Sequence, residues 1–505
     1  MSEQYEVEVV ISEGEKRFEL YRKTISLFLG PIIFFILILT PLPFLSTEAH
    51  RLSAVLGLVL IYWVGEAIPI PATAILGPVL CVILDVAKSG TVFAPFSHPI
   101  IFLFIGSFIL AEAMKIHKLD YRIALSILSL PWVGNSYYRV FLAIAIIPAL
   151  ISMWISDSAT TAMMYPITLG ILTTVKELSG DVKSRFDVGI LLTIAYAALI
   201  GGIGTPIGTP PNLIGIGMID KLIGRNIPFF LWMLMALPIM ITMLIFMLIY
   251  MFSIYKTPAK EIKGLSGFIA QKRSEMGQWT RGQKNTLFAF AVAIILWILP
   301  GIFAVVSGTN SAVYKFLDEH IHEEIVSLIA VLILFFTPVD WKYKKFTITW
   351  NEAVKIDWGT ILLFGGGLSL GGLMFSTKLA DFMGNMLIKI TGVDTLWGLT
   401  AVAIGLAIVT TEVTSNTATA NMLIPVMISV AQIAGVSGIP PAIGVSLGAS
   451  MAFMLPVSTP SNAIIYGSGR VPITSMIKAG IILDIVSFFV IFTGLRILCP
   501  LLGLI

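Results

Sequence analysis

Long apolar segments follow one another along almost the whole chain, separated by short polar stretches. The segments at 227–250, 287–305 and 475–498 are each close to the roughly 20 residues that a helix needs to cross a hydrocarbon core. Polar residues do not recur at every second position, as they do in the strands of membrane barrels. Because lipid offers the backbone no hydrogen-bond partner, such segments are expected to be helices. The pattern predicts an all-α polytopic membrane protein.

Two apolar segments are each folded around a short polar tip and are expected to form re-entrant hairpins, at 138–175 and 395–433. Eleven other segments are expected to cross the bilayer as transmembrane helices. Their expected ranges are 25–45, 51–68, 71–88, 99–117, 187–220, 226–254, 285–306, 322–337, 358–376, 440–466 and 472–499.

Composition supports a lipid environment, since 57% of the 505 residues are hydrophobic and 12% are charged, whereas soluble domains carry about 25% charged residues. The net charge of +3 is spread over loops and predicts no binding of nucleic acid. Cys81 and Cys499 lie far apart in apolar segments, so we expect two core cysteines. The histidines lie near span ends or in loops, and no nucleophile has an oriented base, so an enzyme is not expected.

The distribution of basic residues predicts the orientation of the chain in the membrane. With the N-terminus in the cytoplasm, 23 Lys and Arg residues fall on the inner side and eight on the outer side. Inner loops of membrane proteins carry such an excess. We therefore expect a multi-pass protein with a cytoplasmic N-terminus and an extracellular C-terminus, most simply in the plasma membrane.

The polar 255–284 segment divides the chain into two similar halves. SMWISDSA from Ser152 resembles TEVTSNTA from Thr411, and GTPPN from Gly208 resembles STPSN from Ser458. The halves have opposite expected orientations, which is the inverted repeat typical of secondary transporters. The expected organisation is a cytoplasmic N-terminal segment at 1–24, a first half at 25–254 with hairpin 138–175, a cytoplasmic linker at 255–284, and a second half at 285–505 with hairpin 395–433.

Each half interrupts its apolar helices twice, once at a hairpin tip and once at a Gly- and Pro-rich break. Pro removes an amide donor, and broken helices leave free amides at one end and free carbonyls at the other. Helix N-termini favour carboxylates, whereas carbonyl and hydroxyl oxygens suit a hard cation such as Na⁺. No Lys or Arg lies in the four motifs. The motifs together predict a site for an anion and cations between the halves.

These paired motifs resemble those of the divalent anion/sodium symporter family, the INDY-type dicarboxylate transporters. The similarity includes TEVTSNTATANMLIP from Thr411, FMLPVSTPSNAIIYGSG from Phe453 and MWISDSATTAMMYP from Met153, and it extends over nearly the whole chain. The resemblance implies a homodimer in the lipid bilayer, with scaffold and transport domains that work by an elevator movement. It implies no cofactor, with Na⁺ as a coupling or structural ion.

The resemblance also implies which residues form the site. Substrate-binding residues are implied at Ser156, Asp157, Ser158, Thr209, Pro210, Ser415, Asn416, Thr417, Thr459 and Pro460. Cation-binding residues are implied at Ser152, Ser156, Asp157 and Gly208 in the first half, and at Thr411, Thr414, Asn416 and Ser458 in the second.

Two positions depart from the family pattern. Asp157 stands where the family has Asn, and Ser461 stands where it has the second Pro of the break. A buried carboxylate needs a cation, a proton or a basic partner, and a cation held permanently would weaken coupling to Na⁺. The sequence therefore favours a di- or tricarboxylate transporter that exchanges one dicarboxylate for another. Na⁺-coupled symport is the alternative, and an anion channel or a membrane sensor is a remoter one.

Overall fold

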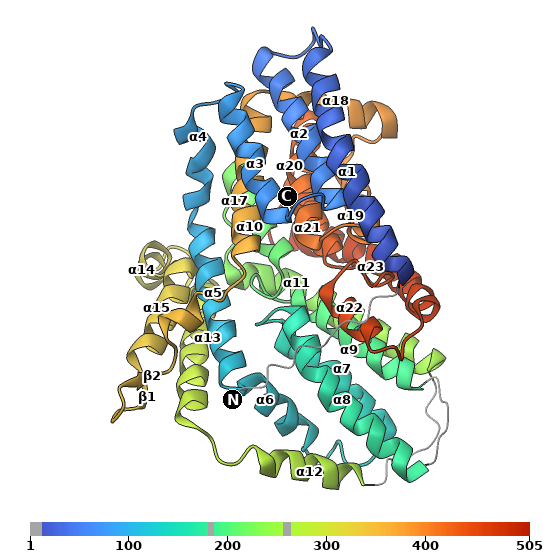
Figure 1. The fold of residues 1–505 in the computed structure, drawn as a ribbon. Helices are drawn as coiled ribbons and strands as arrows, with labels where there is room; N and C mark the ends of the chain where they lie inside the picture. The colour runs from blue at the N-terminus through green and yellow to red at the C-terminus, as the bar shows by residue number, and fades with distance from the viewer. Residues whose placement is uncertain (1–12, 180–185, 256–263) are drawn as a thin grey trace.

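The computed structural model describes residues 13–179, 186–255 and 264–505 and is helical almost throughout (Figure 1). The first half contains α1 (Glu13–Leu39), α2 (Thr47–Gly65), α3 (Ile70–Ile83), α4 (Ser89–Phe93), η1 (Ala94–Ser97), α5 (Pro99–Ile116), α6 (Leu119–Leu128), α7 (Tyr137–Ser152), α8 (Asp157–Ser179), α9 (Phe186–Gly202), α10 (Pro210–Ile223) and α11 (Phe229–Ile254). The remainder contains α12 (Leu265–Glu275), α13 (Arg281–Ser307), α14 (Ala312–His320), α15 (Glu323–Phe336), α16 (Trp350–Ala353), α17 (Trp358–Ser376), α18 (Leu379–Thr391), α19 (Leu396–Thr411), α20 (Asn416–Ile433), α21 (Ile439–Ala449), α22 (Pro460–Gly467) and α23 (Ile473–Leu501).

One small element lies outside the helical pattern. Strands β1 (Pro338–Asp340) and β2 (Lys345–Phe346) form an antiparallel hairpin between α15 and α16. The prediction of an all-helical membrane fold is otherwise confirmed.

Six described helical segments are long and apolar enough to cross a membrane, where the sequence predicts eleven spans. They are α1, the α4–α5 segment, α11, α13, α17 and α23. Of the five other expected spans, three form the single helices α2, α3 and α15, which are too short or not apolar enough to be counted, and two are interrupted. Segment 187–220 forms α9 and α10, and segment 440–466 forms α21 and α22, so each piece is shorter than a full span. A further pair, α18 and α19, is bent by 95°.

The two halves repeat each other in the order of their helices. Each has a long helix (α5 or α17), a short one (α6 or α18), a two-helix hairpin, a broken helix and a final long helix. The short helices begin alike, because Lys118 before α6 and Lys378 before α18 both adopt the left-handed conformation, with φ of 52° and 61°. This shared turn extends the repeat beyond the motifs visible in the sequence.

Four non-helical segments interrupt the repeated helices and are named here by their residues. The first tip is 153–156 between α7 and α8 together with Asp157 and Ser158, which begin α8. The second tip is 412–415 between α19 and α20 together with Asn416 and Thr417, which begin α20. The first break is 203–209 between α9 and α10, and the second break is 450–459 between α21 and α22. Proline occupies the first position of α10 and of α22, where the missing amide leaves no backbone acceptor unsatisfied.

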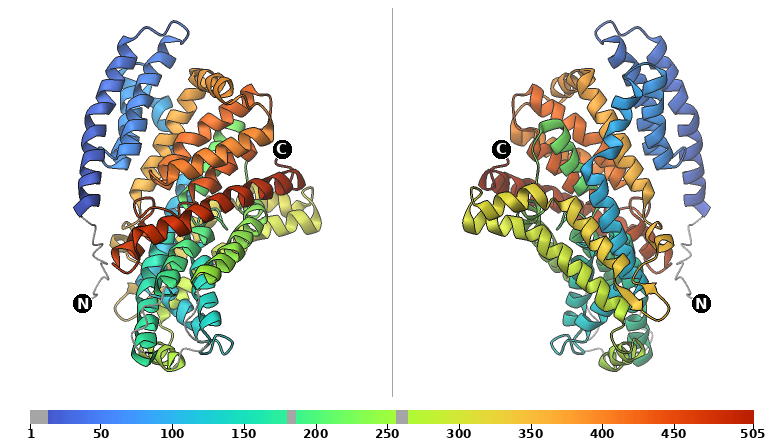
Figure 2. Two further views of the ribbon diagram at one scale, coloured as in Figure 1. Left: turned by 90° about the vertical axis from the view of Figure 1, so that its right-hand side faces the viewer. Right: turned by 90° about the vertical axis from the view of Figure 1, so that its left-hand side faces the viewer.

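The halves are joined by contacts between unlike elements. Helix α8 of the first hairpin packs on α22, and α20 of the second hairpin packs on α10. Helices α9 and α21 are buried at almost every position, as expected for helices that are apolar on all sides. The buried interior therefore lies where helices of the two halves pack against each other, whereas α1 and α2 lie at the edge of the molecule (Figure 2).

Candidate substrate and cation site

Equivalent asparagines hydrogen-bond to backbone carbonyls at the two breaks. Asn212 Nδ2 donates to the carbonyls of Gly202 (3.1 Å) and Thr205 (2.8 Å). In the second half, Asn462 Nδ2 donates to the carbonyls of Ala452 (2.9 Å) and Leu455 (3.1 Å). The asparagine and its two carbonyl partners in the first half each precede their counterparts in the second half by 250 positions. The halves thus repeat in hydrogen bonding as well as in sequence.

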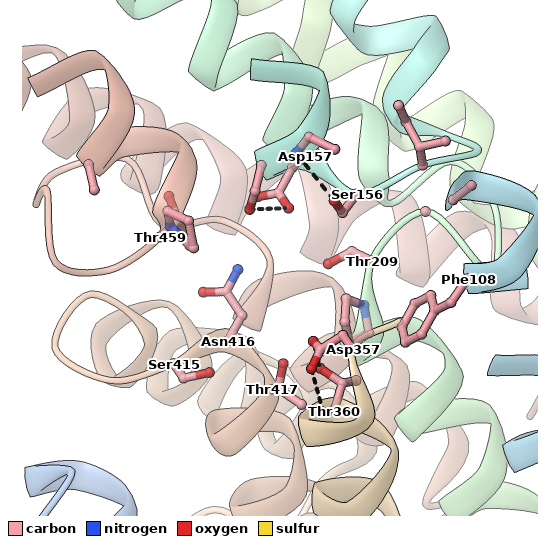
Figure 3. A pocket seen from close by; sticks show the side chains of 18 of the residues that line it. Phe108, Ser156, Asp157, Thr209, Asp357, Thr360, Ser415, Asn416, Thr417 and Thr459 are labelled. Atoms are coloured by element: carbon pink, nitrogen blue, oxygen red, sulfur yellow. Dashed lines mark hydrogen bonds between the residues drawn. The ribbon is translucent and has the colours of Figure 1, made fainter. Parts of the chain in front are cut away.

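The tips and breaks of both halves meet around one cavity of about 750 Å³ (Figure 3). All ten residues for which the resemblance implies substrate binding line this cavity. Side chains of the first half, such as Asp157 and Thr209, face Asn416 and Thr417 of the second half across it (Figure 3). The cavity has the size and the mixed polar and apolar lining of a small-molecule site.

The first tip gathers oxygen atoms. A Cβ added to Gly208 would lie 2.4 Å from the Gly202 carbonyl oxygen and 2.8 Å from that of Ser152, so the break approaches the end of α7 closely. Ser152 is fully buried, and its Oγ has no hydrogen-bond partner within the described residues. Asp157 begins α8 and lines the same cavity as Gly208. Carbonyl, hydroxyl and carboxylate oxygens without nearby basic groups fit a hard cation.

The second tip presents hydrogen-bond donors instead. The Ser415 side chain does not cap α20, and the first described backbone bond to the Ser415 carbonyl comes from Thr419. The amides of Asn416, Thr417 and Ala418 are thereby left for a ligand. Thr411 Oγ1 donates to Asn416 Oδ1 (2.7 Å), which leaves the side-chain amide nitrogen free to face the cavity. These donors and the positive end of the helix dipole suit a carboxylate.

The residues implied for cations differ between the halves. Ser156, Asp157, Gly208, Asn416 and Ser458 line the cavity, whereas the rest of the set, Ser152, Thr411 and Thr414, is buried behind it. Unlike Ser152, the second-half hydroxyls are satisfied. The Ala449 carbonyl also lies 2.7 Å from Thr411 Oγ1, so the single hydroxyl hydrogen is shared between Asn416 Oδ1 and this carbonyl. Thr414 Oγ1 bonds to Thr419 Oγ1 (2.8 Å).

Comparison with known proteins places the chain among transporters. Residues 21–505 match the family described as the sodium:sulfate symporter transmembrane region. The chain belongs to this family. It is therefore a multi-pass membrane protein of a transporter family, not an enzyme.

Individual relatives agree with this assignment. A sodium-dependent dicarboxylate transporter, SdcS, of Staphylococcus saprophyticus is 35% identical over 487 residues, covering 94% of this chain and 91% of the relative. SdcS of Staphylococcus aureus is 32% identical over 475 residues, covering 92% and 89%. An uncharacterized transporter of Haemophilus influenzae is 35% identical over 471 residues, covering 92% and 95%.

Solved structures of more distant transporters share the fold. The YdaH transporter of Alcanivorax borkumensis aligns with a TM-score of 0.52 over 97% of both chains, at 12% identity. MtrF of Neisseria gonorrhoeae aligns with a TM-score of 0.53 over 83% of this chain and 84% of that one, at 11% identity.

The two positions at which this transporter departs from the family pattern touch each other. Ser461 Oγ donates to Asp157 Oδ2 (3.2 Å), joining α22 of the second half to the first tip. A proline at 461 could not make this bond. Asp157 forms no ion pair with a basic residue in the described part of the transporter, and its other side-chain contact is Ser158 Oγ (3.5 Å).

Several lining residues were missed from the sequence because they lie outside the repeated motifs. Asp357 caps α17 and accepts from the Thr360 amide (3.1 Å) and from Thr360 Oγ1 (2.5 Å). Phe108 contributes an apolar wall (Figure 3). Lys115 and Lys355 are exposed lining residues that place basic side chains at the edge of the cavity. Only Asp357, an acid directly before an apolar run, carried a recognisable signal.

Proposed function

We propose that this protein is a secondary transporter that moves small dicarboxylates, such as succinate, malate or 2-oxoglutarate, together with Na⁺. Two relatives more than 30% identical over nine-tenths of the chain are named sodium-dependent dicarboxylate transporters. The lining residues of the present cavity supply chemistry suited to both solutes.

The observation that carries the proposal is the opposite character of the two tips across one cavity. The uncapped N-terminus of α20 offers amides to an anion, while the first tip offers Asp157 and the unpartnered Ser152 hydroxyl to a cation. An anion and a cation bound in one cavity stabilise each other, because opposite charges a few ångströms apart attract strongly where water is excluded. Such mutual stabilisation is the physical basis of coupled transport.

Residues of the second tip are assigned to the substrate. One carboxylate is placed against the α20 amides, the Asn416 side chain, and the Ser415 and Thr417 hydroxyls. The rest of the substrate extends toward Thr209 and Thr459. Pro210 and Pro211 provide no amides at the start of α10, so the first break contributes a hydroxyl and a helix dipole rather than a row of donors.

Residues of the first tip are assigned to Na⁺. Ser152, Ser156, Asp157 and the carbonyls crowded around Gly208 supply the oxygen ligands. The second-half counterparts are a weaker candidate, since the Thr411 and Thr414 hydroxyls already have partners.

The names of the relatives favour Na⁺ symport over the exchange that the sequence favours. The exchange hypothesis rests on Asp157 holding a permanent cation or a fixed internal pair. The Asp157 carboxylate contacts the Ser461 hydroxyl and has no basic partner within the described residues. It is therefore able to bind a transported ion. Exchange is retained as the second candidate. The Asp157 carboxylate, which the family pattern lacks, would bind a cation more tightly, and a cation held permanently would weaken coupling to Na⁺.

We further propose that the N-terminus lies in the cytoplasm, the C-terminus lies outside, and the cavity opens inward. The β1–β2 hairpin, α6 and α12 lie at one end of the molecule, whereas α18 and the α1–α2 turn lie at the other (Figure 1). The first end holds many of the basic loops expected inside. The exposed lining residues Lys115 and Lys355 belong to the same predicted inner set. A homodimer that moves its substrate site by an elevator motion, in the plasma membrane, completes the proposal.

Transport in reconstituted vesicles tests this function. Empty vesicles given labelled succinate and an inward Na⁺ gradient should accumulate succinate, and a K⁺ gradient of equal size should not support accumulation. Uptake only into vesicles preloaded with 2-oxoglutarate, regardless of Na⁺, would instead establish exchange. A succinate conductance without accumulation would establish a channel, and binding without any flux would establish a sensor.

A further inference from the structure

Two carboxylic side chains, one from the second tip and one from α23, meet outside the cavity. Glu412 follows the last residue of α19, and Asp484 lies in the middle of α23. They are 2% and 6% exposed, and neither lines the cavity. The two carboxyl groups lie within hydrogen-bonding reach of each other.

Glu412 holds the second break in place. Its Oε1 accepts from the Met454 amide (2.9 Å) and its Oε2 accepts from the Leu455 amide (3.1 Å). Both oxygens therefore act as acceptors, as those of an ionised carboxylate do. The equivalent residue of the first tip is Met153, 259 positions earlier, so the first half has no such anchor.

Asp484 lacks the partners that an ionised carboxylate requires. Neither of its oxygens meets a donor with hydrogen-bond geometry among the described residues, although the Phe453 amide lies close to both carboxyl groups. Next to a negatively charged Glu412, a second charge at this position would be strongly destabilised.

Within the described ranges, no basic side chain forms an ion pair with Glu412 or Asp484. The Tyr196 phenol of α9 lies near both carboxyl groups, and the phenols of Tyr250 in α11 and of Tyr255, which directly follows α11, lie near Tyr196. Tyr196 donates to the Met476 carbonyl (3.3 Å), and Tyr250 donates to that of Lys478 (3.2 Å). Helices α19, α20 and α21, which form the surrounding packing, contain no ionisable residue.

Basic residues on α23 itself point elsewhere. The side chains of Lys478 and Arg496 are exposed on the surface of the protein, whereas Asp484 is buried. No group of three or more His, Cys, Asp or Glu suitable for a metal occurs in the described residues, and the backbone amides around Glu412 would repel a cation.

We propose that Glu412 and Asp484 form a proton-binding site, with one proton on Asp484 donated to Glu412. A proton is the only ligand that turns the contact of two acceptors into a hydrogen bond while leaving both Glu412 oxygens to the Met454 and Leu455 amides. The proton lies on Asp484 of α23, which neither lines the cavity nor belongs to the residues implied for cations. It makes the second break sensitive to pH, because loss of the proton leaves two charges in contact and pushes Glu412 from its anchor.

Infrared spectroscopy of the purified full-length protein tests the site directly. The wild type should show, at neutral pH, the carbonyl absorption of a protonated carboxylic acid that disappears in Asp484→Asn and persists in Asp381→Asn, an exposed control on α18. If Asp484→Asn leaves the carboxylic-acid absorption unchanged, the proposal is overturned.

Thermal unfolding distinguishes the two members of the pair. Asn at 484 is neutral and can donate to Glu412, so Asp484→Asn should unfold at the wild-type temperature at neutral pH and lose less stability as the pH is raised. Glu412→Gln should unfold at a lower temperature, because its amide group faces two backbone donors. Equal destabilisation by both variants, or an Asp484→Asn protein that is unstable at neutral pH, would contradict the assignment of the proton to Asp484.

Discussion

The first and second tips have the same backbone course and opposite chemistry. Each follows a helix of 16 residues and leads into the N-terminus of the next. The first tip carries Asp157 and the unpartnered Ser152 hydroxyl, whereas the second carries Asn416 and an uncapped helix N-terminus. The inverted repeat thus determines where ligands meet, and a few side chains determine which charge each half receives.

The largest effect is expected at the asparagines that brace the breaks, a feature that both halves share. Asn212→Ala and Asn462→Ala each leave at least two buried carbonyls without a donor. At about 1–3 kcal/mol for each buried unsatisfied group, each variant should lose roughly 2–6 kcal/mol of stability. Thermal unfolding in detergent measures the loss, with the exposed Asn351→Ala as control. A marked effect of one variant and none of the other would show that the breaks are not equivalent.

The next effect distinguishes the short helices α6 and α18. Asp120 of α6 corresponds to Ala380 of α18, and burial raises the pKa of Asp120 to about 6, against the opposing effect of the Tyr121 amide. Because the folded state holds this proton more tightly than the unfolded state, stability is greatest below the unfolded pKa and falls as pH rises through about 6.

Asp120→Asn should therefore be more stable than the wild type at pH 7, by up to about 3 kcal/mol, and should unfold at a higher temperature. Its unfolding temperature should also change less with pH in acid. Unfolding temperatures between pH 4 and 7 test this, with the exposed Asp381→Asn as control. An unchanged acid profile would show that Asp120 does not titrate in this range.

Asn416→Ala is expected to impair substrate binding most among changes at the tips. It removes a donor to the substrate carboxylate and the acceptor for Thr411. A hydrogen bond to a charged group contributes about 1.5–3 kcal/mol, so kcat/KM for succinate should fall roughly 10- to 150-fold. Uptake by vesicles measures it, with the exposed Asn385→Ala on α18 as control. Wild-type kinetics in Asn416→Ala would remove the second tip from the site.

The smallest effect concerns the contact between Asp157 and Ser461. Ser461→Ala should raise the Na⁺ concentration needed for half-maximal transport when Asp157 is present, and should raise it less in an Asp157→Asn background. Because the two side chains share a hydrogen bond, the coupling free energy between the two substitutions should be roughly 0.5–1 kcal/mol. Ser468→Ala, which lies beyond α22 and does not line the cavity, is the control. Additive effects on Na⁺ half-saturation would mean that the contact plays no part in cation binding.

The sequence predicts the interruptions better than the contacts between them. Pro210 and Pro460 mark the helix starts at the breaks, because proline ends one helix and suits the first turn of the next. The short helices α6, α12, α14 and α18 are not predicted, since they lack the length and uniform hydrophobicity of a span. Expected spans that contain a break therefore divide into shorter helices.

The contacts that set the charge of each half depend on tertiary packing. Asp157 and Ser461 are separated by 304 positions, and Glu412 and Asp484 are joined only by the packing of α19 against α23. No local periodicity indicates such pairs. Both members of the first pair are visible as departures from the family pattern, but only the structure brings them together.

Ligand-induced thermal stabilisation of Asp157→Asn and Asn416→Ala, measured with Na⁺ alone and with succinate added, tests the division of roles between the tips most directly. Asn416→Ala should be stabilised by Na⁺ as the wild type is but should gain nothing from succinate. Asp157→Asn should require about tenfold more Na⁺ for the same stabilisation, the equivalent of about 1.4 kcal/mol. A normal Na⁺ response in Asp157→Asn together with a lost one in Asn416→Ala would contradict this division of roles.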